Sequence, residues 1–213
     1  MVKDSEKIPC KNSPQKPMGL VKQTSIKPTR NKNGNIHFSD RGDFVPNLTP
    51  KEIFHLGSFG GTYYRPIYSC VTGQNYQDMW KEFPRDWFPN DIDKYVVSDT
   101  CHLQLNKYGK KSGTSLRYWE DQGWIDPLDP YGWVQWYCRF YLGRRSYDDN
   151  RQIDRYLKIA DEKSGRWRKN LTNKIIAKAN ELNMDPNNLI DDYTISPTIR
   201  QLLQHWAFVL KKI

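Results

Sequence analysis

The side chains with the strongest chemical character in this sequence are arginines that gather in one short segment. The candidate contact residues are Arg144, Arg145, Arg151, Arg155, Arg166, Arg168 and Lys169. A planar guanidinium binds phosphate oxygens through paired hydrogen bonds better than an ammonium group does. The interleaved Tyr147, Tyr156 and Trp167 have rings that can stack on bases. The segment therefore predicts a surface for a phosphate-rich partner such as nucleic acid.

A second interpretation of the same arginines is structural. Acidic residues follow closely in the chain and can neutralise several of the arginines in ordinary ion pairs. These are Asp148, Asp149, Asp154, Asp161 and Glu162. The two interpretations make different demands on the fold: the first needs the guanidinium groups at the surface, and the second needs them paired inside the domain.

A glycine-rich stretch, residues 57–67, forms a second candidate site. The residues of interest are His55, Gly60, Gly61, Tyr63, Tyr64 and Arg65. Successive backbone N–H groups in such a loop can hold an anion, although the Gly-Lys-Ser/Thr ending of a phosphate loop is missing. The alternative is that the glycines let the backbone pass close to an aromatic core. If the protein is an enzyme, we expect its pocket here, with His55 or Asp148 as the proton carrier.

Other reactive groups show no functional spacing. The four histidines and four cysteines include no metal-ligand pattern and no Cys-x-x-Cys pair. No serine lies in a nucleophile elbow. The sequence thus predicts no metal and no cofactor, and it defines no reaction. The widely spaced cysteines also predict no disulfide framework, which fits a reducing compartment.

Several amphipathic segments are expected to position these residues. Helix-start signals and apolar spacing predict helices over residues 49–56, 75–83, 114–122, 130–142, 147–160, 166–182 and from 196 onward. The segment 130–142 is apolar nearly all round and should lie in the centre of the core. Residues 95–97 suggest one short strand. The expected fold is mainly α, a compact single domain of about six or seven helices with long aromatic-anchored loops and little strand.

Composition divides the chain into two parts. Residues 1–40 carry eight Lys/Arg against three acids and few large apolar side chains, which predicts a disordered basic tail. Residues 41–213 form the expected globular domain. No stretch approaches the 18 apolar residues of a membrane span, and the N-terminus lacks a secretory h-region. The expected location is therefore intracellular (nuclear, cytoplasmic or in a virion) and neither membrane-bound nor secreted.

Several longer runs carry a resemblance to a known family. They are Pro46–Glu52, Gly57–Tyr63, Lys111–Ser115, Asp129–Trp133, Gln135–Arg145 and Asp148–Ile153. Together they resemble an uncharacterised family of eukaryotic and large-DNA-virus proteins, over about residues 44–210. The resemblance implies one compact intracellular domain and supplies no activity, cofactor or catalytic residue.

These observations lead to three alternatives for function. The first is a nucleic-acid-binding protein that acts through the Arg-rich helical face, with the lysine-rich tail adding affinity. The second is an enzyme on a nucleotide or phosphorylated substrate, with a pocket near the glycine-rich loop. The third is a structural or virion-associated protein without a ligand, in which the arginines pair internally.

Overall fold

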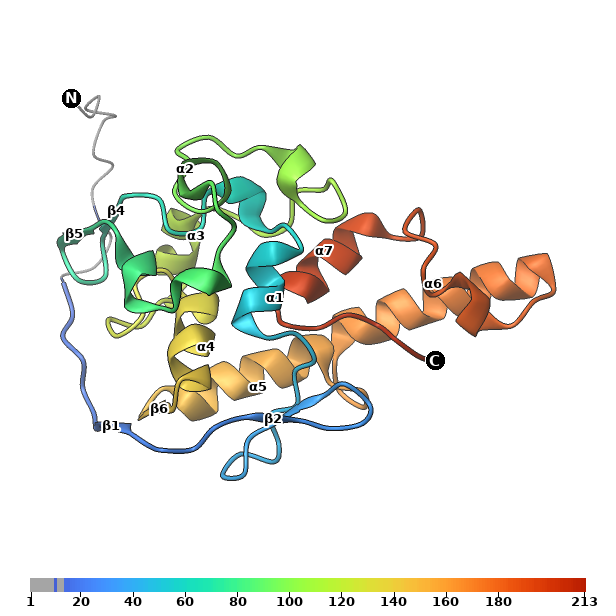
Figure 1. Cartoon of the computed structure of the whole chain (residues 1–213), viewed down its shortest axis with the longest axis horizontal. Coiled ribbons are helices and arrows are strands. Elements are labelled where there is room, and N and C mark those ends of the chain that lie inside the picture. Colours follow the sequence, from blue (N-terminus) through green and yellow to red (C-terminus); the bar gives the residue numbers. More distant parts are fainter. Residues whose placement is uncertain (1–9, 11–13) are drawn as a thin grey trace.

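The computed structural model describes Cys10 and residues 14–213, and it shows a mainly helical fold (Figure 1). The α-helices are α1 (Pro50–His55), α2 (Ile92–Tyr95), α3 (Leu116–Asp121), α4 (Trp133–Tyr141), α5 (Asp149–Ala160), α6 (Arg166–Leu182) and α7 (Pro197–His205). Short 3-10 turns are η1 (Phe59–Gly61), η2 (Met79–Glu82), η3 (Arg85–Trp87), η4 (Leu103–Leu105) and η5 (Pro186–Leu189). The strands are β1 (Val21–Gln23), β2 (Thr29–Arg30), β3 (Ile36–His37), β4 (Ile67–Ser69), β5 (Gln74–Tyr76) and β6 (Arg144–Ser146). The prediction of a mainly α fold with little strand is confirmed.

Helix α4 lies at the centre of the core, as its apolar sequence predicts. Trp136, Tyr137 and Phe140 are fully buried on it. Phe44 packs against this helix, with its ring 5.6 Å from that of Phe140 and 4.9 Å from that of Tyr156 on α5. Edge-to-face pairs of this kind add stability beyond the area that they bury. A core built from large rings explains how a chain of low mean hydropathy folds.

Local signals in the sequence account for the helix ends. At α1, Thr49 accepts a hydrogen bond from the Glu52 N–H, and the Glu52 side chain accepts one from the Thr49 N–H, which is a complete capping box. Helix α7 begins at Pro197, where the missing N–H costs nothing. Helix α6 ends at Asn183 in the left-handed conformation.

The N-terminal segment departs from the expected disordered tail. Strand β1 pairs antiparallel with β6, with Val21 opposite Ser146, and the blue segment runs beside β6 in Figure 1. Ile36 and Phe38 are buried in the core. Residues 21–23 and 36–38 thus belong to the fold, which does not begin at residue 41. The rest of the expected tail, residues 1–9 and 11–13, lies outside the described residues.

Four further local expectations are corrected. Residues 75–83 form β5 and η2 in place of a helix, and residues 92–95 form helix α2 where a strand at 95–97 was expected. Ser146 lies in β6, so α5 begins after Asp148. Cys10 and Cys70 form a disulfide bond, where the sequence predicts no disulfide framework. None of the helices within the described residues has the length and apolar character needed to cross a membrane.

Candidate functional site

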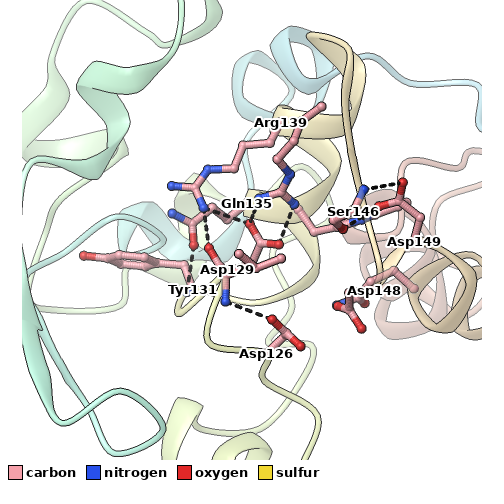
Figure 2. A network of polar contacts seen from close by, with 12 residues as sticks. Asp126, Asp129, Tyr131, Gln135, Arg139, Ser146, Asp148 and Asp149 are labelled. Atoms are coloured by element: carbon pink, nitrogen blue, oxygen red, sulfur yellow. Dashed lines mark hydrogen bonds and ion pairs between the residues drawn. The ribbon is translucent and has the colours of Figure 1, made fainter. Parts of the chain in front are cut away.

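The structure pairs Arg144 and Arg145 inside the domain. Arg144 donates two hydrogen bonds to Asp129, at 2.8 and 2.5 Å, and the Asp129 side chain is fully buried. Figure 2 shows the same carboxylate facing Arg139 from α4. Arg145 pairs with Asp40 at 2.7 Å, and its guanidinium lies 3.7 Å from the Phe140 ring centre. These two arginines hold β6 to the core and present no free guanidinium to a partner.

The remaining basic residues of the segment do not form one surface either. Arg151 pairs with Asp148 at 2.5 Å, and Arg168 pairs with Glu162 at 3.1 Å. Arg166 and Lys169 are exposed at the start of α6, and neither is in an ion pair with a described residue. The expected Arg-rich face is thus divided between internal pairs and a few exposed side chains.

Arg155 differs from all of these arginines. It is half-buried on α5, and its guanidinium lies 5.7 Å from the ring centre of Trp124 and 5.3 Å from that of Trp206. It donates hydrogen bonds to the Trp124 carbonyl at 3.2 Å and to Gln152 Oε1 at 3.0 Å. Among the described residues, no carboxylate forms an ion pair with it. Desolvation, together with the nearby charge of Arg151, lowers the pKa of Arg155 to about 10, so it remains a cation at neutral pH.

The glycine-rich loop is fixed by backbone contacts and does not form an anion cradle. The Gly60 N–H donates to Asn106 Oδ1 at 2.7 Å, and the Gly61 N–H donates to the Ser58 carbonyl. Gly61 has φ +83°, and a Cβ there would lie 2.1 Å from the Lys94 carbonyl oxygen. The glycines therefore serve close packing of the chain, which was the alternative to anion binding.

The other residues proposed around this loop separate into two groups. His55 is exposed on α1, with Nε2 3.0 Å from the Asp86 carbonyl, and Tyr64 is fully buried in the core. Tyr63 and Arg65 do line a cavity. The Tyr63 hydroxyl donates to the Tyr131 carbonyl at 2.8 Å, and burial raises its pKa well above the ordinary value. Tyr63 thus holds the cavity wall and does not exchange protons.

That cavity adjoins a second one through shared lining residues, and the two together are here called the cleft. The inner half, here called the tryptophan chamber, has a volume of about 410 Å³, within the range of small-molecule sites. Its walls include Trp119, Trp124, Trp133, Trp167, Trp206 and Arg155. The outer half, here called the mouth, has about 290 Å³ and includes Arg65, Asp99, Cys101 and the loop 111–115. The residues that line both halves are Phe59, Tyr63, Ser112, Gly113, Thr114, Trp119, Tyr131 and His205.

Five helices supply the chamber walls. Trp119 lies on α3, which Ser115 caps by accepting from the Tyr118 N–H at 3.2 Å. Trp133 begins α4, and its ring centre lies 4.6 Å from that of Trp206 at the end of α7. The Trp133 indole N–H is buried and has no hydrogen-bond partner among the described residues. A buried donor without an acceptor is costly and calls for an explanation.

His205 lies where the chamber and the mouth meet. The ring stacks on Phe59 at 3.9 Å, and its Nε2 accepts a hydrogen bond from the Phe59 N–H at 3.1 Å. Burial lowers the pKa of His205 to about 3. The imidazole is therefore neutral at physiological pH, with Nε2 as the acceptor and the proton on Nδ1. Such a ring can donate a hydrogen bond, but it is a poor proton carrier.

Sequence reasoning did not identify most of this cleft. The sequence pattern assigned no role to Trp119, Trp124, Trp206 or His205, because none of them has a chemical partner at a short spacing. Asp148, the other proton-carrier candidate, is buried against Arg151 and Gln152 and does not line the cleft. Among the described residues, no group of three His, Cys, Asp or Glu side chains is placed to hold a metal ion.

Comparison with known proteins adds no family or fold assignment. The chain matches no protein-family model, no curated protein and no solved structure.

Proposed function

We propose that this protein binds a flat aromatic molecule in the tryptophan chamber, with a hydrogen-bond acceptor or a negative charge of that molecule against Arg155. The binding site of this proposal is the chamber, and the Arg-rich face as a whole is not the binding surface. The observation that carries the proposal is the pairing state of Arg155. It is a desolvated cation without an ion-pair partner among the described residues, in the wall of an aromatic cavity.

The chemistry of the walls defines the ligand. Indole rings favour flat apolar groups, which stack on them or pack against their edges. Arg155 is a donor in this wall, so it favours a ring that carries acceptor atoms. A carbonyl, ring nitrogen or carboxylate of that ring would accept hydrogen bonds from the Arg155 guanidinium. The chamber therefore suits a nucleobase or an aromatic acid.

Nucleic-acid binding over the Arg-rich face has less support. Arg144 is held by the buried Asp129, and freeing it would leave a buried carboxylate with one cation fewer, while Arg145 is itself buried and pairs with the exposed Asp40. Of the seven basic residues proposed for that face, Arg166 and Lys169 are exposed without an ion pair to a described residue. Two such side chains provide only weak attraction for a polyanion.

The test is equilibrium binding measured by tryptophan fluorescence and calorimetry. The probes are adenosine, guanosine, cytidine, uridine and benzoate, used against the wild type, Arg155→Met and the matched control Arg166→Met. We expect saturable binding of at least one probe, weakened about ten-fold or more by Arg155→Met, since a hydrogen bond to a charged group contributes about 1.5–3 kcal/mol. Arg166→Met should bind as the wild type does.

A stability measurement separates this role from a structural one. If Arg155 serves a ligand, Arg155→Met should be at least as stable as the wild type, because the substitution removes a desolvated charge. No saturable binding by any of the five probes would overturn the proposal. Equal losses in Arg155→Met and Arg166→Met would do so as well.

A further inference from the structure

We propose that the mouth of the cleft binds a phosphate group, so that the ligand is a nucleotide with its base in the tryptophan chamber. This inference rests on the proposed function and extends it to a second site. The two cations that support it, Arg65 and Lys111, line the mouth and not the chamber.

Two cations of the mouth form no ion pair with a described residue. Arg65 donates one hydrogen bond, from Nη1 to the Thr62 carbonyl at 3.0 Å, and is in no ion pair there. Lys111 is exposed and likewise has no ion-pair partner in the described part of the chain. Asp99 is the one carboxylate that lines the mouth, so the formal charge of the mouth is +1. Arginine can bind a phosphate through two parallel hydrogen bonds, and lysine can bind it as a point charge.

The loop 111–115 adds neutral donors of the kind that bind phosphate. It reads Lys-Ser-Gly-Thr-Ser, with hydroxyls on Ser112, Thr114 and Ser115. The backbone N–H groups of Ser112, Gly113 and Thr114 make no hydrogen bond to the chain that the structure describes. Gly113 has φ +90°, and a Cβ there would lie 3.3 Å from the Trp119 ring. The loop thus folds directly over a chamber wall and leaves its donors open.

The shared walls of the two halves favour a nucleotide over separate ligands. The mouth and the chamber share eight lining residues, which are Phe59, Tyr63, Ser112, Gly113, Thr114, Trp119, Tyr131 and His205. A molecule with its ring among the tryptophans must pass this shared wall to reach Arg65 and Lys111. A nucleotide has that order of groups: an aromatic base, a sugar with hydroxyls, and a phosphate at the far end. The neutral His205 offers its Nδ1–H at the junction, where a sugar hydroxyl would lie.

The experiment compares each nucleoside with its own 5′-monophosphate by calorimetry. For the wild type we expect the phosphate to tighten binding about ten-fold or more, as expected for charged hydrogen bonds. In the double variant Arg65→Met/Lys111→Met, this ratio should fall towards one while nucleoside affinity stays unchanged. The matched control is Lys110→Met, since Lys110 is the adjacent exposed lysine and its side chain does not line the mouth.

The outcomes distinguish this inference from the proposed function. Nucleosides that bind as tightly as their phosphates would overturn the phosphate site and leave the chamber intact. Equal effects of Lys110→Met and of the double variant Arg65→Met/Lys111→Met would also overturn it. If no nucleoside and no nucleotide binds, the inference fails, and benzoate binding alone would then preserve the proposed function.

A last arm identifies the source of the nucleotide. A 5′-phosphorylated pentanucleotide is compared with the mononucleotide and with the same oligomer lacking its 5′-phosphate. Tighter binding of the phosphorylated oligomer assigns the site to the end of a nucleic-acid chain, and tighter binding of the mononucleotide assigns it to a free nucleotide. Both results support the phosphate site, whereas no loss on removal of the phosphate from either ligand contradicts it.

Discussion

The buried His205 predicts a specific loss of stability in mild acid. Its imidazole is 7% exposed, and desolvation is the cause that lowers its pKa to about 3 from an ordinary value of 6.5. Between these two values the unfolded chain binds a proton at this residue and the folded chain does not. Stability from this group is therefore fully present above pH 6.5 and is lost as the pH falls towards 3.

The size of the effect follows from the two pKa values. A pH of 5 is about 1.5 units below the pKa of His205 in the unfolded chain. Each unit corresponds to about 1.36 kcal/mol. The free energy of unfolding should thus fall by about 2 kcal/mol between pH 7 and pH 5 through this residue alone. The protonated ring would also lose the Nε2 acceptor for the Phe59 N–H, which lies 3.1 Å away.

The assay is urea denaturation of the wild type and His205→Gln at pH 7, 6 and 5. Glutamine retains a side-chain acceptor for the Phe59 N–H and carries no titrating group. We expect the wild type to lose about 2 kcal/mol more than the variant over this range. Parallel slopes for the two proteins would refute the reasoning, because every other titrating group is common to both.

Three further predictions concern the scaffold. Arg144→Met should cost about 3 kcal/mol or more in thermal denaturation, because it leaves the fully buried Asp129 with one cation fewer; a change below 1 kcal/mol would contradict this pairing. Gly61→Ala should destabilise by more than about 2 kcal/mol, since it combines positive φ with a backbone clash, whereas Gly42→Ala, which has open space for a Cβ, should be nearly neutral. Thiol titration of the unfolded, unreduced chain should detect two of the four cysteines. Reduction of the disulfide should lower stability by about 4 kcal/mol, since the bond closes a loop with a sequence separation of 60. Four reactive thiols before reduction would show that the bond does not form.

The helices were predictable because their signals are local. The capping box at Thr49 and the apolar spacing of α6 depend on residues within a few positions of one another. Strand β1 had no such signal, since all three of its residues are exposed and its partner β6 lies more than 120 positions away. A composition rule that identifies disorder from few apolar residues cannot detect pairing of this kind. The helix expected at 75–83 failed for a related reason: Asp78 adopts φ +61°, which interrupts the helix.

The candidate site was harder to predict because it depends on which acid meets which arginine. The carboxylates considered as partners were the nearest in sequence, Asp148 to Glu162. The structure instead supplies Asp129 for Arg144 and Asp40 for Arg145, at separations of 15 and 105 residues. The chamber likewise draws its walls from five helices, so no single window of sequence contains it. Tryptophans at those positions look like ordinary core residues until the fold leaves a cavity between them.

The pairing of the arginines also explains why the proposed site moved from a surface to a cavity. A desolvated guanidinium is costly, and the fold offsets that cost at Arg144 and Arg145 with carboxylates. At Arg155 it supplies a carbonyl, an amide oxygen and two ring faces, none of which carries a full negative charge. A buried cation that meets no negative charge within the protein lowers stability. A binding site can contain such a cation, because a ligand can then supply the missing negative charge. The same arginine segment therefore contains Arg144 and Arg145, which stabilise the scaffold, and Arg155 on α5, which we assign to a ligand.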